Sequence, residues 1–241
     1  MAPSSEIIVR ENPGELAVEA SDFILREIQD SSARPFFLAL AGGSTPAAAY
    51  RELAELPVDW SSVQLFLSDE RYVPVDDPNS NFGVLRESLL DRIDVTEEQV
   101  HAYQTNRQAD EAALSYESEI RKLIAGDAVP AFDLLLLGIG ANGHTASLFP
   151  GEPEVDENKR LVVPTTNELA TPPGPPLRRL TFTFPLINAA RVVAVIASGE
   201  EKAEAVGAAM RQERPDEITA SRISPAGRLV WLLDRAAASR L

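Results

Sequence analysis

The 241-residue sequence contains no cysteine, which excludes disulfide bonds, thiolate nucleophiles and cysteine-ligated metal sites. It has only two histidines, and His101 lies in an ordinary polar stretch, so a histidine-based metal site is not expected. No apolar run approaches the roughly 18 residues that a transmembrane helix needs. The segment MAPSSEIIVRENPGEL lacks the charged and then apolar regions of a signal peptide. We therefore expect a soluble, cytoplasmic protein without a membrane partner.

Positive charge is scarce: 22 lysines and arginines face 37 aspartates and glutamates, giving a formal net charge of −15. Such an acidic chain is a poor partner for nucleic acid or for an anionic membrane surface. No obligate protein partner is evident either. If the substrate is an anion, a few cations must gather at one place against an unfavourable overall field.

Short apolar runs alternate with amphipathic helical patterns along the chain. Helices are predicted at about Pro13–Gln29, Pro46–Leu56, Phe82–Leu90 and Asp110–Ile124, with a short one after the closing run GRLVWLLD. Continuous apolar runs are typical of parallel strands that are covered on both faces. The prediction is therefore a single α/β domain, residues 1–241, with an open, doubly wound, mainly parallel sheet and helices on both faces, as in Rossmann-like folds.

One strand departs from this pattern. The segment LTFTF, Leu180–Phe184, alternates threonine with apolar residues, so it is predicted as a half-exposed or edge strand.

The segment AGGSTP follows a buried strand and opens a helix. Gly42 and Gly43 allow the backbone to approach a ligand closely. Thr45 is a suitable N-cap and Pro46 a suitable first helical residue, which leaves backbone N–H groups and the positive end of the helix dipole facing outward. With the hydroxyls of Ser44 and Thr45, this loop is either a phosphate site or a plain tight turn before a well-capped helix.

Charged residues follow two further strands. Asp69, Glu70 and Arg71 form either a solvated loop or a place where the guanidinium is held to grip a phosphate. Lys202 lies in the first turn of a helix, where a cation costs about 0.3–1 kcal/mol. Either the glutamates beside it offset that cost, or the lysine faces an anionic ligand. One of the two arginines before LTFTF is a further candidate cation.

His144 lies in the loop GIGANGHTASLFPG, directly after the apolar run FDLLLL. Gly138, Gly140 and Gly143 keep this loop open, so the histidine is either a structural residue or a catalytic one. A serine–histidine hydrolase is not indicated, because the chain has no GxSxG nucleophile elbow.

Taken together, these segments resemble the 6-phosphogluconolactonases over nearly the whole chain and in the same order. The resemblance rests on LALAGGSTPAAAY, LFLSDERYVPVDDPNSNFGVLRESLL, LLLLGIGANGHTASLFPG, RRLTFTFPLINAARVVAVIASGEEKAEAV and GRLVWLLD. Resemblance to the glucosamine-6-phosphate deaminases of the same superfamily is weaker, since those tend to have DEY in place of DER.

The resemblance implies a hydrolase that converts 6-phospho-D-glucono-1,5-lactone to 6-phospho-D-gluconate in the oxidative pentose phosphate pathway, without a metal or organic cofactor. His144 falls on the family's catalytic histidine. The predicted substrate-binding residues are Gly42, Gly43, Ser44, Thr45, Asp69, Arg71, Arg179 and Lys202.

One position departs from the family pattern. Asn142 stands where the family usually has aspartate, two residues before the histidine, and we expect it to orient the imidazole. A histidine with an ordinary pKa near 6.5 is suited to take a proton from water at neutral pH. The alternatives are a glucosamine-6-phosphate deaminase or isomerase on the same fold, and a phosphosugar-binding protein in which Asn142 marks lost catalysis.

Overall fold

The computed structural model describes residues 5–126, 128–170 and 175–241. The segment MAPSSEIIVRENPGEL, in which no signal peptide is predicted, has its first four residues outside the described part. Within that part, no helix is both long enough and apolar enough to cross a bilayer.

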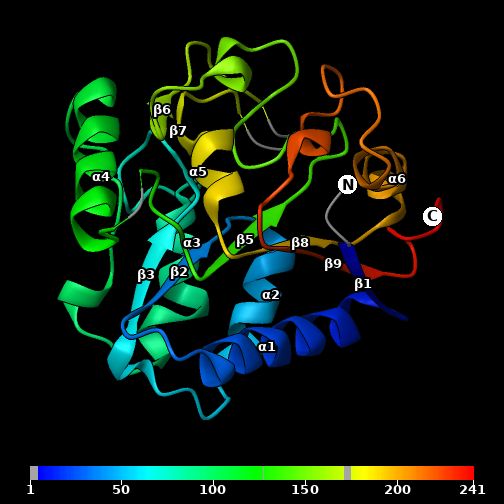
Figure 1. The fold of residues 1–241 in the computed structure, drawn as a ribbon, viewed down its shortest axis with the longest axis horizontal. Coiled ribbons are helices and arrows are strands. Elements are labelled where there is room, and N and C mark those ends of the chain that lie inside the picture. Colours follow the sequence, from blue (N-terminus) through cyan, green and yellow to red (C-terminus); the bar gives the residue numbers. More distant parts are fainter. Residues whose placement is uncertain (1–4, 127, 171–174) are drawn as a thin grey trace.

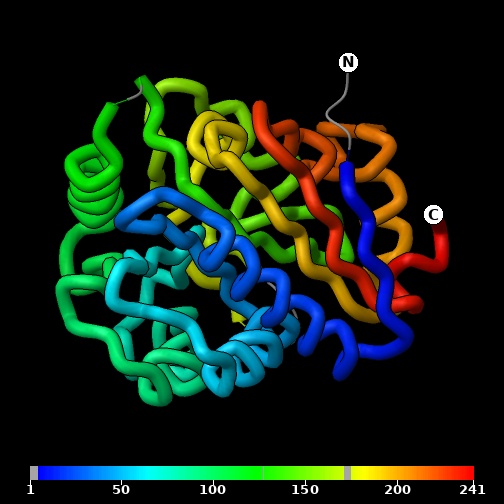
Figure 2. Tube along the Cα trace, turned by 60° about the horizontal axis from the view of Figure 1, so that its bottom comes forward, coloured from blue at the N-terminus to red at the C-terminus, as the bar shows by residue number. Residues whose placement is uncertain are grey.

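Six parallel strands form the main sheet. Their order across the sheet is β1 (Ser5–Arg10), β9 (Arg228–Asp234), β8 (Val192–Ala197), β5 (Leu134–Gly138), β2 (Phe36–Leu40) and β3 (Val63–Leu67). Figure 2 shows β1, in blue, beside β9, in red. Every residue of β8 is buried, as expected for a strand with both faces covered. The α/β, mainly parallel prediction is confirmed.

Helices cover both faces of this sheet. They are α1 (Pro13–Asp30), α2 (Ser44–Leu53), α3 (Asn81–Ser88), α4 (Ala109–Leu123), α5 (Phe184–Ala189) and α6 (Ala203–Met210). In Figure 1, α1 and α2 lie below the sheet, and α5 and α6 lie above it. Short 3-10 segments connect these elements at Trp60–Ser62, Leu90–Arg92, Glu97–Gln99, Pro153–Asp156, Glu200–Lys202 and Thr219–Arg222.

The strands β2 and β5 are neighbours whose outgoing connections lead in opposite directions across the sheet. The chain passes from β2 to β3 on one side and from β5 to β8 on the other. At such a switch point the loops after the two strands diverge, and a crevice opens at the carboxyl ends of the strands. The AGGSTP and GIGANGH segments are those two loops.

A small antiparallel sheet, β4 (Asp69–Arg71), β7 (Arg179–Phe182) and β6 (Val162–Pro164), stands beside the main one. Its central strand is β7, all of whose residues are buried, so the half-exposed or edge strand predicted at Leu180–Phe184 is wrong. Alternating threonines do not signal exposure here, because their hydroxyls are satisfied inside the protein. Thr181 accepts the N–H of Ser147, and the Thr183 hydroxyl donates to a backbone carbonyl.

Two helix predictions need correction. Gly43, rather than Thr45, is the N-cap of α2, and Pro46 is the third helical residue instead of the first. Gly43 has a φ of 105°, a conformation that glycine adopts without cost, so the chain turns into the helix two residues earlier than predicted. After β9, residues 235–240 form turns and not the predicted short helix.

Glu70 joins β4 to the start of α3 from a buried position. Its carboxylate accepts the backbone N–H groups of Arg71, Asn81 and Phe82 at 2.6, 2.6 and 2.7 Å. Burial raises the pKa of Glu70, and these hydrogen bonds oppose that rise. Glu70 is therefore a structural residue that holds the strand carrying its neighbours Asp69 and Arg71.

We predict that Glu70→Gln destabilises the protein. The amide keeps one acceptor oxygen and turns an NH₂ group toward backbone donors, which should cost about 1–3 kcal/mol of the free energy of unfolding. Denaturant titration measures this loss. Glu87→Gln on the exposed side of α3 is the control. Equal stability of the two variants would show that the Glu70 hydrogen bonds contribute little.

Candidate active site

A cavity of about 310 Å³ lies at the carboxyl edge of the main sheet. The loops after β2, β5 and β8 form it together with β4 and β7. It brings together His144 and all of the predicted substrate-binding residues, namely Gly42, Gly43, Ser44, Thr45, Asp69, Arg71, Arg179 and Lys202. Three cations of this acidic chain, Arg71, Arg179 and Lys202, thus lie around one cavity.

The loop after β2 depends on its two glycines. A Cβ atom on Gly42 would lie 2.0 Å from Oδ1 of Asn81, so any larger residue would displace that side chain. Gly43 holds the positive φ that starts α2. Ser44 and Thr45 then occupy the first two helical positions, where backbone N–H groups have no partner within the helix and face an anion favourably.

The imidazole of His144 is oriented by Asn142. The Asn142 Oδ1 atom lies 2.5 Å from Nδ1 of the ring and 3.3 Å from the backbone nitrogen of His144. A backbone N–H only donates, so the amide oxygen is the atom that faces it, and Nδ1 then carries the ring proton. The remaining ring nitrogen, Nε2, is left as a proton acceptor.

Two further residues fix the plane of this ring. The imidazole stacks on Phe149, with 4.0 Å between centroids and 10° between planes. On the loop side, a Cβ atom on Gly140 would lie 2.2 Å from Cε1 of the ring. Gly140 is therefore needed for the close approach of ring and backbone, and Phe149 supplies the opposite support.

The electrostatics of the cavity keep this imidazole neutral. Burial is the largest cause of a lowered pKa at His144. The positive charges of Arg179, Lys202 and Arg71 add to it, and together they bring the pKa to about 3. A neutral imidazole can accept a proton, whereas an imidazolium cannot.

Arg179 is the most deeply placed cation, with 3% of its surface exposed. Its guanidinium carbon lies 5.2 Å from the centre of the Phe149 ring, within range of a cation–π interaction. Burial lowers the pKa of Arg179, while the carboxylate of Asp69 opposes this shift. A bound phosphate would relieve the desolvation of this charge.

The other two cations come from separate elements. Arg71 in β4 donates from Nη1 to the carbonyl of Asn79 at 2.8 Å, which holds the side chain at the cavity. Lys202 is the residue directly before α6, and burial lowers its pKa despite the nearby carboxylates of Glu201 and Asp234. Lys202 therefore lies at a helix start and carries a desolvated positive charge that faces the cavity.

Asp69 is buried rather than part of a solvated loop. Its carboxylate accepts the hydroxyl of Ser147 at 2.6 Å and so ties β4 to the loop that carries His144. Asn81 donates from Nδ2 to the backbone carbonyl of Asp69 at 2.9 Å and also lines the cavity.

Four residues of the site were missed by sequence reasoning: Asn81, Ser147, Phe149 and Glu201. All four lie inside the segments that carry the family resemblance, but no spacing rule marks their side chains. Arg178, one of the two arginines before LTFTF, was the other candidate cation. Its side chain lines a different cavity.

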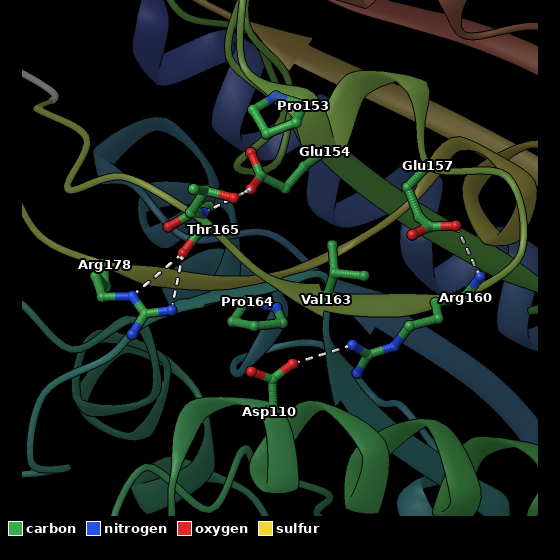
Figure 3. A pocket seen from close by; sticks show the side chains of 10 residues that line it. Asp110, Pro153, Glu154, Glu157, Arg160, Val163, Pro164, Thr165 and Arg178 are labelled. Carbon is green, nitrogen blue, oxygen red and sulfur yellow. Dashed lines mark hydrogen bonds and ion pairs between the residues drawn. The ribbon is translucent and has the colours of Figure 1, made fainter.

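A second cavity, of about 450 Å³, lies beside β6 and the start of α4 (Figure 3). Its charged groups already bind one another or the backbone: Arg160 pairs with Asp110 at 3.1 Å, and Arg178 donates to the carbonyl of Thr165 at 3.2 Å. None of the predicted site residues lines it. The smaller cavity, which gathers three cations around a neutral histidine, is therefore the candidate active site.

In the described part of the chain, no group of three or more histidine, aspartate or glutamate side chains is placed to hold a metal ion.

The sequence model described as "Glucosamine-6-phosphate isomerases/6-phosphogluconolactonase" matches residues 11–231. A curated 6-phosphogluconolactonase from Bos taurus is 36% identical over an alignment that covers 100% of this chain and 95% of that protein. The structure of a 6-phosphogluconolactonase from Trypanosoma brucei superposes with a TM-score of 0.90 at 29% identity, covering 100% of both chains. A monomeric glucosamine-6-phosphate deaminase superposes with a TM-score of 0.82 at 25% identity, covering 98% of this chain and 100% of that one.

We predict that the His144 ring does not titrate near pH 6.5 and takes up a proton only toward pH 3. The unfolded chain binds this proton below about pH 6.5. His144 should therefore reduce stability progressively as the pH falls from 6.5 toward 3, and His144→Gln should remove that part of the pH dependence. NMR titration of the ring measures the pKa directly.

The same NMR titration repeated with inorganic phosphate provides the comparison. A bound dianion offsets the field of the three cations, so the pKa of His144 should rise when phosphate is added. A midpoint near 6.5 that phosphate does not move would contradict the electrostatic description of the cavity.

Proposed function

Because the chain belongs to the family of glucosamine-6-phosphate isomerases and 6-phosphogluconolactonases, we propose that it hydrolyses 6-phospho-D-glucono-1,5-lactone to 6-phospho-D-gluconate with His144 as the base. One observation carries the proposal: a neutral, oriented imidazole stands in a cavity that also gathers three cations and a glycine loop. This combination suits a substrate that is phosphorylated at one end and reacts with water at the other.

The phosphate group is bound by the glycine loop and by charge. The backbone N–H groups at the start of α2 and the side chains of Arg71 and Lys202 are the donors that we assign to it. Binding energy from this end of the substrate positions the lactone carbonyl, which does not itself carry the charge.

The chemical step follows from the tautomer of His144. Nε2 accepts a proton from water while the water oxygen attacks the lactone carbonyl, and a tetrahedral oxyanion forms. The bond to the ring oxygen then breaks, and the imidazolium returns its proton to that oxygen, which becomes a hydroxyl group. The new carboxylic acid loses its proton to solvent, so the histidine ends as it began.

The same field that lowers the pKa of His144 favours the oxyanion, because both effects reflect positive potential in a partly desolvated site. Phosphate binding offsets part of that potential and makes the imidazole a stronger base. Substrate binding and base strength are therefore coupled through the cations. A strained lactone is reactive already, so the step does not demand a strong base.

We also propose a cytoplasmic location for the reaction. A phosphorylated sugar carries charge that keeps it from crossing a bilayer unaided, so its hydrolysis takes place where it is made.

The alternative activity is deamination or isomerisation of an aminosugar phosphate, which the similarity to the deaminase structure brings into consideration. The test is a lactone assay that traps the product and is corrected for spontaneous hydrolysis, run beside an assay for glucosamine-6-phosphate deamination. Equal lactone loss with and without protein would remove the proposed function. Activity in the second assay alone would establish the alternative, and activity in neither would favour a phosphosugar-binding protein.

We predict that His144→Ala lowers kcat by about 10²–10⁴-fold, the usual contribution of a general base, while the protein stays folded. Asn142→Leu should lose much of the rate as well, because the ring is no longer oriented. Asn142→Asp should stay active, and its carboxylate should raise the pKa of the imidazole and move the acid limb of kcat/KM to higher pH. Near-native turnover in His144→Ala would exclude the mechanism.

We predict a substrate-selective effect for the cations. Arg71→Ala or Lys202→Ala should raise KM for the phosphorylated lactone by about 10- to 100-fold, the loss expected for a hydrogen bond to a charged group. The effect on unphosphorylated gluconolactone should be much smaller. Arg178→Ala is the control, since that side chain faces the second cavity. Equal losses on both lactones would indicate a structural role for the cations.

A further inference from the structure

The strand β1 lies at one end of the main sheet and pairs only with β9 among the described elements. Two of its apolar side chains are unusually exposed, Ile7 at 46% and Val9 at 40%. A flat edge strand with exposed apolar residues is a template for another strand, and proteins usually protect such an edge with charges, bulges or covering segments.

The backbone groups that face outward can be identified from the pairing. The carbonyl of Arg10 accepts the N–H of Arg235, so Arg10 directs its backbone toward the β9 side. Backbone direction alternates along a strand, and both polar groups of one residue point the same way. Ile7 and Val9 therefore direct their N–H and C=O groups away from the sheet. On this outer side the carbonyl of Val9 accepts a hydrogen bond from Nη1 of Arg10 at 2.9 Å, so a partner strand shares or displaces that contact.

We propose that two copies of the chain associate through β1, antiparallel and about a two-fold axis at Ile8, so that their sheets join. In this register Ile7 lies opposite the partner's Val9 as a hydrogen-bonded pair, which uses the outward backbone groups. Ile8 lies opposite the partner's Ile8. Glu6 lies opposite the partner's Arg10, and the same ion pair forms again on the other side of the axis.

The neighbouring registers lack this match. An axis at Ile7 also pairs outward backbone groups but puts Glu6 opposite Ile8. An axis at Val9 puts Ile8 opposite Arg10. Only the axis at Ile8 pairs apolar residues with apolar residues and opposite charges with each other, and register is set by such a pattern. The segment EIIVR is complementary to itself when it is reversed.

The charged side chains are held beside the strand by their own chain. Glu6 pairs with Arg228 at 3.1 Å, and Arg10 pairs with Glu19. In the dimer each cross-strand pair extends one of these intrachain pairs into a network. Exchanging the charges of Glu6 and Arg10 would break both intrachain pairs but would restore the two ion pairs between the copies. The exchange therefore separates the effect of the contacts between copies from that of the intrachain pairs.

The experiment measures association by sedimentation velocity and equilibrium over a range of protein concentrations. The wild-type chain should show a reversible monomer–dimer equilibrium. Glu6→Arg and Arg10→Glu each place like charges opposite one another twice, and each should weaken the dimer by roughly tenfold. The double exchange Glu6→Arg with Arg10→Glu should recover affinity close to that of the wild type, although it loses both intrachain pairs.

Val9→Lys is a second test at the outward edge, and Leu114→Lys is its matched control. Leu114 is 54% exposed on α4, which lies at the opposite end of the molecule from β1 (Figure 1). Val9→Lys should abolish the dimer, and Leu114→Lys should leave it intact. Unfolding temperature confirms that each variant is folded.

A wild-type chain that stays monomeric up to high micromolar concentration would overturn the proposal. So would a double exchange that dimerises no better than the single variants, because the single effects would then come from lost intrachain pairs. An equal response to Val9→Lys and Leu114→Lys would likewise reject the β1 edge as the interface.

Discussion

The desolvation of positive charge at one edge of the sheet is the constraint on which the rest of the site depends. Burial lowers the pKa of Arg179 and of Lys202, and the acidic remainder of the chain is placed so that it does not cancel these charges completely. A cation that has lost much of its water favours an anionic ligand. Burial is the larger cause of the lowered pKa of His144, and the field of the same cations adds to it. In the proposed mechanism, phosphate affinity and the protonation state of the base therefore depend on the same cations.

Buried carboxylates make this arrangement stable without occupying the place of the substrate. The Glu70 carboxylate accepts backbone N–H groups at the start of α3, and the Asp69 carboxylate accepts the hydroxyl of Ser147. They hold β4 in position and moderate the repulsion between Arg71 and Arg179, which face each other in the antiparallel pair β4–β7. Two carboxylates next to Arg71 therefore support the proposed phosphate site indirectly.

The sheet and the site loops were predictable from the sequence because both rest on local rules. Continuous apolar runs indicate parallel strands, and ligand loops follow their carboxyl ends. What failed depends on tertiary contacts. Thr181 in β7 and Thr183 just after it find partners far away in the chain. The positive φ of Gly43 moves a helix start by two residues. Phe149 was missed because an aromatic residue after a loop is usually a core residue. Its role became visible only when the structure showed that it stacks on the His144 ring.

The departure at Asn142 fits this electrostatic arrangement. An aspartate two residues before His144 would add a negative charge next to Nδ1, raise the imidazole pKa and also offset part of the cation field. The amide supplies the same hydrogen bond to Nδ1 without that charge, so the ring stays oriented and the positive potential stays available for phosphate and oxyanion. The cost is a weaker base in the free protein. Because a bound phosphate itself offsets the cations, that cost is largest when no substrate is present and smallest when the reaction takes place.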